Sequence, residues 1–166
     1  ENALRYDWNN NEKKRNNNGF DIIVGNPPYV GASKIDEETK LLLKNWSVSK
    51  SGKSDLYIPF FEIALENLNN DGVLGYITVN TFYKSLNGRS VRSYFSRNKF
   101  DLTIIDFRGE QLFKNRSTYT CICLISKLES DTIKYVKSKS SEINSIKKNN
   151  FISVLYSELN DFDGWF

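Results

Sequence analysis

The 166-residue sequence predicts an α/β fold built on a mostly parallel sheet. Short apolar runs rich in β-branched residues alternate with longer amphipathic segments, which is the pattern of strands joined by crossover helices. Polar capping residues precede the amphipathic segments, as expected at helix starts. Strand, helix, strand, helix, strand in this order indicates parallel strands with right-handed connections. The length is sufficient for one compact domain with a hydrophobic core.

The first strand is predicted at about residues 21–25, where Ile22, Ile23 and Val24 form a short β-branched run of the kind found in buried strands. Residues 1–19 are polar and rich in Asn and Lys, and we interpret them as a surface lead-in. The rigid tetrapeptide Asn-Pro-Pro-Tyr, residues 26–29, follows the strand. Ligands of open α/β sheets bind beyond the carboxyl ends of the strands, so the tetrapeptide lies where a site is expected.

Two helices are predicted next. Asp36 is the expected N-cap of a short helix that carries acidic residues in its first turn. Ser54 or Asp55 can cap the second helix, and Pro59 falls in its tolerant first turn. The polar segment 69–72 is expected to end this helix. One face of the second helix is apolar: Tyr57, Phe61, Ala64, Leu65 and Leu68.

The later elements complete the sheet. We expect a buried strand over 73–79, a loop over 80–88 and a helix over 90–97. Further strands are expected over 102–107, 118–126 and 133–136. Residues 1–137 then form the main domain. The Ser-, Lys- and Asn-rich segment 138–150 is interpreted as a linker, so that residues 138–166 comprise the linker and the possible start of a following domain near Phe151 to Leu155.

Composition excludes several classes of protein. The net charge is +3, which is too low for a strongly basic nucleic-acid module. The sequence has no histidine, which removes Ser-His-Asp and Cys-His catalysis and the helical HExxH zinc site. Cys121 and Cys123 alternate within an apolar strand, and we interpret them as core residues of a reducing compartment and expect no metal site. The apolar runs are too short to span a bilayer and the polar N-terminus resembles no signal peptide, so we expect a cytoplasmic protein without membrane contact.

The tetrapeptide has the chemistry needed to hold a planar amine. The side-chain oxygen of Asn26 accepts a hydrogen bond from an amino group. Pro27 and Pro28 have no N–H, so this corner offers carbonyls with few competing donors. Tyr29 adds a flat face for stacking. Two acceptors on an exocyclic amine favour a tetrahedral nitrogen whose lone pair points out of the ring plane, without a strong base. The alternative is a plain turn, because Asn-Pro often begins one.

The segment from Phe20 to Tyr29 resembles motif IV, the NPPY motif, of S-adenosylmethionine-dependent amino-methyltransferases. The resemblance extends over about residues 5–127 through four further segments: Tyr6-Asp7-Trp8, Ser54 to Glu62, Gly72 to Phe82, and Ile104 to Thr120. It points to the adenine-specific, gamma-type DNA methyltransferases of restriction–modification systems, similar to type IIG enzymes that also carry a nuclease. Such a resemblance implies a Rossmann-like class I methyltransferase fold, here the C-terminal half of the sheet, mostly parallel with a final antiparallel strand.

The resemblance implies roles for named residues. Asn26, Pro27 and Tyr29 would be catalytic, and Phe113, Tyr119 and Pro28 would contact an extruded adenine, with core packing as the alternative for the two aromatic rings. Asn80 and Thr81 would line the cavity or the cofactor side, with a loop turn as the alternative. Cations in loops near the site would neutralise DNA phosphates, with a solvated surface as the alternative; the candidates are Lys84, Arg89, Lys114 and Arg116, and Lys50, Lys53 and Arg92 belong to the same group.

The sequence departs from the family in one respect. No glycine-rich loop for the methyl donor precedes the tetrapeptide, and the chain begins with Glu1. We therefore expect a fragment that covers the second half of a catalytic domain and is inactive alone, with most of the S-adenosylmethionine site upstream. Double-stranded DNA is the expected partner, with fused or associated restriction and target-recognition domains. The alternatives are methylation of protein glutamine or RNA, and a non-catalytic DNA-binding or scaffold fragment. The sequence does not specify a recognition site.

Overall fold

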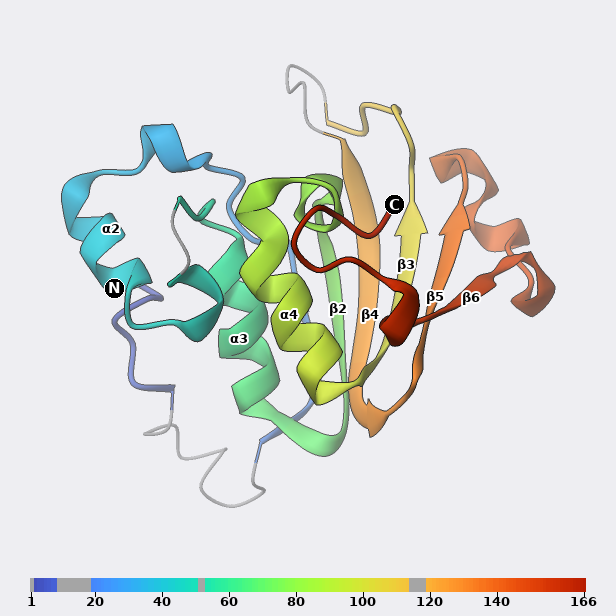
Figure 1. Ribbon diagram of the computed structural model, residues 1–166, viewed down its shortest axis with the longest axis horizontal. Coiled ribbons are helices and arrows are strands. Elements are labelled where there is room, and N and C mark those ends of the chain that lie inside the picture. Colours follow the sequence, from blue (N-terminus) through green and yellow to red (C-terminus); the bar gives the residue numbers. More distant parts are fainter. Residues whose placement is uncertain (1, 9–18, 51–52, 114–118) are drawn as a thin grey trace.

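The computed structural model describes residues 2–8, 19–50, 53–113 and 119–166. Six strands form one sheet in the order β1-β2-β4-β3-β5-β6 (Figure 1). Their bounds are β1 Phe20–Gly25, β2 Leu68–Val79, β3 Phe100–Asp106, β4 Thr120–Glu129, β5 Thr132–Lys137 and β6 Ile152–Leu155. The predicted α/β class is confirmed, and every strand expected from the sequence is present in some form.

The sheet is mixed rather than mostly parallel in its pairings. Strands β1 and β2 pair in parallel, as do β3 and β5. Strand β4 lies between β2 and β3 and runs antiparallel to both, and β6 runs antiparallel to β5. The expectation of a mostly parallel sheet with one final antiparallel strand holds only in part, because three of the five pairings are antiparallel. Because β4 lies inside the sheet, it forms two antiparallel pairings, one with β2 and one with β3. This position depends on the order of the strands in the sheet, which the local sequence pattern does not encode.

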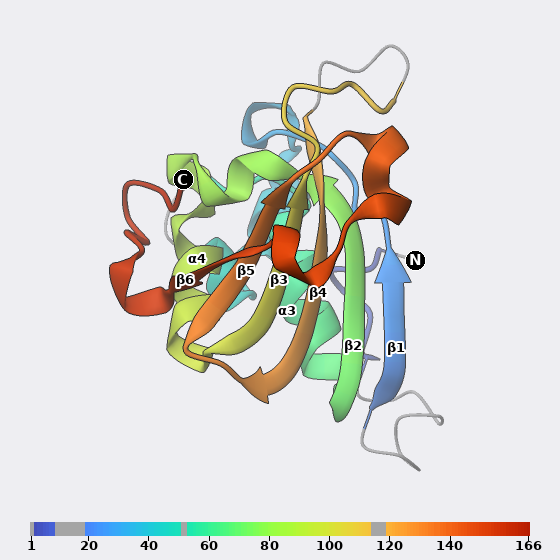
Figure 2. The same ribbon diagram turned by 90° about the vertical axis from the view of Figure 1, so that its right-hand side faces the viewer.

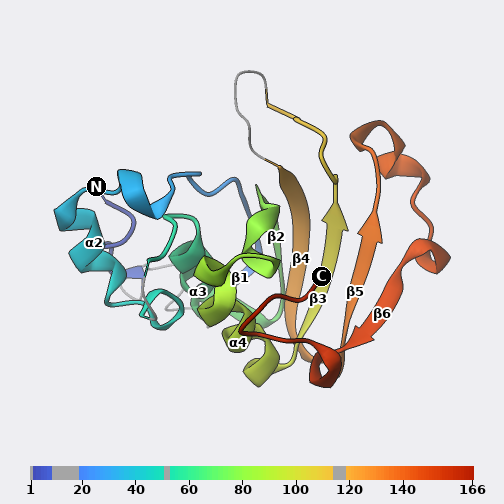
Figure 3. The ribbon, with the colours of Figure 1, turned by 45° about the horizontal axis from the view of Figure 1, so that its top comes forward.

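Among the described residues, three α-helices accompany the sheet: α2 Glu37–Leu43, α3 Ile58–Asn67 and α4 Arg89–Asn98. Short 3₁₀ turns connect the elements: η2 Ala32–Lys34, η3 Ser47–Ser49, η4 Asn80–Tyr83, η5 Leu86–Gly88, η6 Ser140–Ser145, η7 Lys148–Asn150 and η8 Tyr156–Glu158. Helices α3 and α4 lie on the same face of the sheet (Figures 1 and 2). Strands β1, β2, β3 and β5 end at one edge, where α4 begins (Figures 2 and 3).

The hydrophobic core lies between the sheet and helices α3 and α4. Phe61, Phe82 and Phe95 are fully buried there, with ring centroids 5.3 to 6.2 Å apart in tilted or edge-on pairs. Such geometry is the one that aromatic quadrupoles favour. Cys121 and Cys123 contribute to the same core as free thiols, with sulfur atoms 3.8 Å apart. The interpretation of both cysteines as core residues is confirmed.

The opposite face of the sheet is open over β1. Ile22 is 71% exposed and Val24 is 76% exposed, so the expectation that β1 is a buried strand is wrong for the structure. Val73 and Leu124 share this face through the strand register and are also exposed. The reason is that α3 and α4 cover one face only, and β1 lies at the edge of the sheet.

Helix capping differs from prediction at α3. Asp36 caps α2 as expected, because its carboxylate accepts from the backbone N–H of Thr39 at 2.8 Å. Helix α3 begins after Tyr57 without a side-chain cap, and Pro59 lies in its first turn. Asp55 does not cap it, because its carboxylate bonds to another segment described below. The segment 69–72 does not end the helix either, because β2 begins irregularly at Leu68, with a shift in its register against β1.

The C-terminal segment packs on the same sheet. The stretch from Phe151 to Leu155 contains β6, which pairs with β5. Trp165 is buried against Phe82 and Phe95. Arg92 is fully buried and donates to backbone carbonyls of α4's neighbours, Phe82, Ser85, Asp161 and Phe162, at 2.6 to 3.1 Å. The expectation that Arg92 is a loop cation available to phosphate is therefore wrong.

In the part of the chain that the structure describes, no helix is long and apolar enough to cross a membrane.

Candidate active site at the end of β1

The tetrapeptide directly follows β1 at the edge where the parallel strands end. Asn26 and Pro28 are exposed, Pro27 is buried and Tyr29 is half-buried. The backbone N–H of Val30 donates to the carbonyl of Pro28 at 3.0 Å, which closes a tight turn. Asn26 is therefore accessible to solvent, whereas Pro27 is packed against the protein. Such accessibility is required of an acceptor that meets an incoming ligand.

The side chain of Tyr29 is tethered to β2 through its hydroxyl group. Its hydroxyl donates to the carbonyl of Ile77 on β2 at 3.1 Å. Burial, together with the nearby Cys121 and Cys123 thiols, raises the pKa of Tyr29 to about 12. The phenol is thus neutral near pH 7 and acts as a donor and an aromatic surface rather than as a base.

Phe113 comes to the same place from the loop after β3. Its ring centroid lies 6.2 Å from that of Tyr29, with an interplanar angle of 63°. Both side chains are half-buried, so the pair retains exposed surface at the site. Two aromatic rings far apart in the sequence are therefore brought together just beyond the end of β1.

Asp55 organises the segment after the tetrapeptide. Its Oδ1 accepts from the backbone N–H of Ala32 at 2.9 Å and from Asn87 Nδ2 at 3.3 Å. The backbone N–H of Leu56 donates to the carbonyl of Val30 at 2.9 Å. A cavity of about 170 Å³ lies here, lined by Tyr29, Val30, Gly31, Asp55, Tyr57 and Val79. The sequence marks Asp55 only as a possible helix cap, and nothing in the pattern reveals its actual partners.

Asn80 and Asp106 form a buried pair where β2 and β3 end. Asn80 Nδ2 donates to Asp106 Oδ1 at 3.1 Å, and the Tyr135 hydroxyl donates to Asp106 Oδ2 at 2.7 Å. Burial favours a higher pKa for Asp106, but hydrogen bonds from Tyr135, Asn80 and the backbone of Arg108 outweigh it and keep the pKa below the ordinary value. The sequence pattern does not assign a role to Asp106. The one signal it offers is the position of Asp106 at the end of a strand.

The remaining predicted residues are more scattered. The Thr81 hydroxyl lies 3.4 Å from the hydroxyl of Tyr57, and Asn80 is 4% exposed. Tyr119 is 45% exposed and is not part of the core. Lys84 is exposed, with Nζ 5.2 Å from the ring centroid of Tyr83. Arg89 lies at the start of α4, and Lys114 and Arg116 fall outside the described residues.

No group of three or more possible metal ligands occurs among the residues that the structure describes.

Solved structures share this fold at low sequence identity. The DrdV–DNA complex aligns over 92% of this chain and 19% of its own, with a TM-score of 0.67 and 16% identity. The Type IIL restriction-modification enzyme MmeI, solved in complex with DNA, aligns over 99% of this chain and 22% of its own, with a TM-score of 0.66 and 16% identity. The fold is therefore that of a domain found in restriction–modification enzymes.

The sequence comparison gives the family. The model of the Eco57I restriction-modification methylase family matches residues 1–113. The chain belongs to that family. It is 35% identical over 123 residues to the Type II restriction enzyme and methyltransferase RM.Eco57I of Escherichia coli, which covers 72% of this chain. It is 34% identical over 107 residues to the Type II methyltransferase M.BstVI of Geobacillus stearothermophilus, which covers 64%. The resemblance recognised in the sequence is confirmed.

The aligned region is a small part of each relative. It spans 12% of the Escherichia coli protein and 19% of the Geobacillus protein.

Proposed function

We propose that this chain is the second half of the catalytic domain of a site-specific DNA adenine-N6 methyltransferase in a restriction–modification system. In this proposal residues 1–137 carry the catalytic half, the protein acts in the cytoplasm, and double-stranded DNA is the substrate. The observation that carries the proposal is the Tyr29–Phe113 pair, with centroids 6.2 Å apart beside the exposed Asn26. Relatives named as type II methyltransferases and structures solved with DNA support the same substrate class.

Asn26 and Pro27 would hold the amine. In duplex DNA the adenine amine is stacked and inaccessible, so the base is rotated out of the helix before reaction. The side-chain oxygen of Asn26 and the carbonyl oxygen of Pro27 then each accept a hydrogen bond from one N–H group of the amine. This directs the nitrogen lone pair out of the ring plane, and the catalytic contribution is positioning and electrostatic stabilisation.

Tyr29 would receive the extruded ring. Its hydroxyl bond to Ile77 fixes the plane of the phenol before any ligand arrives, which lowers the entropy lost on stacking. Phe113 meets Tyr29 at a steep angle, so a base stacked on Tyr29 would have the ring of Phe113 at its edge. Stacking on an aromatic side chain contributes roughly 1–3 kcal/mol per base.

S-adenosylmethionine would supply an electrophilic methyl group. The cavity beside the tetrapeptide measures about 170 Å³, whereas ligand pockets usually hold about 300–1,000 Å³. The described residues are thus too few to enclose the cofactor. They would form at most one wall of the cofactor site.

The test is methyl transfer by the full-length protein. The protein is incubated with labelled S-adenosylmethionine and, in separate reactions, with unmethylated duplex DNA, RNA and protein, and the modified products are digested and identified by mass spectrometry. The proposal requires N6-methyladenine in DNA as the main product. Methylated glutamine or RNA as the main product would favour the other enzymatic candidates. Absence of transfer to all three substrates, with DNA binding retained, would indicate a non-catalytic module.

A further inference from the structure

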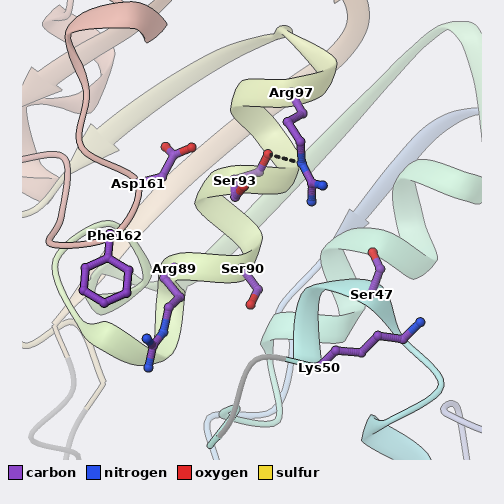
Figure 4. A pocket seen from close by; sticks show the side chains of 8 residues that line it. All are labelled: Ser47, Lys50, Arg89, Ser90, Ser93, Arg97, Asp161 and Phe162. Atoms are coloured by element: carbon purple, nitrogen blue, oxygen red, sulfur yellow. Dashed lines mark hydrogen bonds between the residues drawn. The ribbon is translucent and has the colours of Figure 1, made fainter.

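A second site lies on the outer side of α4, apart from the tetrapeptide. A cavity of about 510 Å³ opens there between α4, the turn η3 and the C-terminal segment (Figure 4). It is lined by three cations, three hydroxyl side chains, one acid and one aromatic ring: Lys50, Arg89, Arg97, Ser47, Ser90, Ser93, Asp161 and Phe162. We refer to these eight residues as the α4 groove.

The cations of the α4 groove are spread along its length. Arg89, Ser93 and Arg97 follow one another at every fourth position of α4, so they share one helix face. At a rise of 1.5 Å per residue, the backbones of Arg89 and Arg97 are about 12 Å apart. Lys50 and Ser47 belong to the opposite wall (Figure 4). The groove is therefore a track of positive charge with hydroxyl donors, longer than one phosphate group.

The charge of these cations is not neutralised within the described part of the chain. The salt bridges between described residues involve none of Lys50, Arg89 and Arg97. The one acid of the groove, Asp161, already accepts at Oδ1 from Ser96 Oγ and Trp165 Nε1, both at 2.8 Å. A negatively charged ligand would therefore meet three cations and one carboxylate, whose formal charges sum to +2.

Arg89 gives the second sign of a ligand. Its Nε is buried and has no hydrogen-bond partner among the described residues, and a buried donor without an acceptor costs free energy. Its guanidinium lies 5.1 Å from the ring centroid of Phe162, which holds the charged group in place. The arginine is thus preorganised at the groove with one donor left to satisfy.

We propose that the α4 groove binds the phosphodiester backbone of DNA next to the target base. This inference rests on the proposed function, because it assumes that DNA is the substrate. Cations combined with serine hydroxyls are the usual contacts to phosphate oxygens. The Arg89 end of the groove lies at the edge of the sheet that carries the tetrapeptide, since Asn87 bonds to Asp55 and Asp55 bonds to Ala32. Backbone contact at this position would fix the register of the duplex while the base is extruded.

The backbone of α4 is tightly fixed at this end. A Cβ atom added to Gly88 would lie 1.8 Å from the carbonyl oxygen of Phe82, so only glycine allows the chain to pass here. Asn87, which bonds to Asp55, and Arg89 of the groove flank Gly88 in the sequence. Gly88 thus packs directly against the backbone of Phe82 at the start of α4.

The test is the salt dependence of DNA binding by the full-length protein. Each phosphate contact contributes about −0.9 to the slope of log K against log salt concentration. We expect Arg97→Gln and Lys50→Gln each to reduce the slope by about one, equally on cognate and unrelated duplexes. Lys148→Gln is the matched control, because Lys148 is exposed in η7, away from the groove, and we expect the wild-type slope. Arg97 and Lys50 are exposed, so these variants should fold.

A wild-type slope in both groove variants would overturn the proposal. If those variants instead lose affinity for poly-glutamate in a parallel assay, the occupant is an acidic protein segment and the DNA proposal also fails. Methyl transfer to DNA is measured on the same preparations. Methyl transfer together with unchanged salt slopes in the groove variants would contradict only the proposal that the α4 groove binds DNA. The absence of methyl transfer by the wild-type protein would contradict the proposed function.

Discussion

The carboxylate of Asp55 accepts a hydrogen bond from the backbone N–H of Ala32 at 2.9 Å, across 23 residues of sequence. The same oxygen accepts from Asn87. Asp55 therefore joins the segment after the tetrapeptide to the turn before α4, and it lines the cavity beside Tyr29. The corner that would hold the amine is positioned by a side chain that need not touch the substrate.

Substitution of Asp55 tests this positioning role. Asp55→Ala removes the acceptor, and hydrogen bonds to a charged group contribute about 1.5–3 kcal/mol, so we expect kcat to fall roughly 10- to 100-fold with KM for DNA little changed. Asp55→Asn keeps an oxygen that can accept from Ala32 and should restore most of kcat. Steady-state kinetics of the full-length protein measure both. Equal losses in the two variants would show that the negative charge, and not the acceptor, matters.

Removal of the Tyr29 ring should affect base extrusion. With 2-aminopurine at the target position, fluorescence rises when the base leaves the stack. Tyr29→Ala removes a stacking surface of roughly 1–3 kcal/mol, and we expect a changed signal in the bound complex. Tyr29→Phe keeps the ring and loses only the hydroxyl bond to Ile77, so its signal should stay near wild type. An unaltered signal in Tyr29→Ala would mean that the base stacks elsewhere.

Stability below pH 5 should depend on Asp106. The folded-state pKa of Asp106 is lowered, so the carboxylate adds stability above its unfolded pKa of about 4, and this is lost as the pH falls through the folded value. We expect wild type to be more stable than Asp106→Asn at pH 7, and the difference to shrink on acidification below about pH 4. Urea midpoints of both proteins across this pH range measure it. A difference that grows on acidification would contradict the prediction.

Arg92 should matter for stability and not for phosphate binding. Its buried guanidinium satisfies carbonyls of four residues, and each carbonyl left unpaired costs about 1–3 kcal/mol. We expect Arg92→Met to lower the melting temperature markedly. Arg97→Met, on the same helix but exposed, should change stability by about 0.5 kcal/mol or less. Similar melting temperatures for the two variants would show that the C-terminal segment is not held through Arg92.

Local sequence signals predicted the elements well, and long-range relationships poorly. The apolar periodicity of Phe61, Ala64 and Leu65 predicted the buried face of α3, and Asp36 predicted the start of α2. The central antiparallel position of β4 depends on strand order, which no local pattern encodes. Exposure of Ile22 and Val24 depends on which face the helices cover, and a β-branched run cannot distinguish a buried strand from an edge strand.

The site shows the same division. The tetrapeptide chemistry could be recognised in the sequence, because residue type alone decides what Asn26 can accept and what Pro27 cannot donate. The roles of Asp55 and Asp106 could not be recognised, because each depends on a partner distant in the sequence. Arg92 was misjudged for a related reason: a charged residue on a helix is usually exposed, and only the docked C-terminal segment buries it.

The most direct test of the central claim is the rate of methyl transfer by Asn26→Ala in the full-length protein. We expect single-turnover transfer to adenine to fall by at least about 100-fold, the scale associated with loss of one preorganised electrostatic contact. The affinity for DNA should stay within a few-fold of wild type, because phosphate contacts dominate binding. A transfer rate equal to wild type with intact DNA binding would contradict the role given to Asn26 and to the corner at the end of β1.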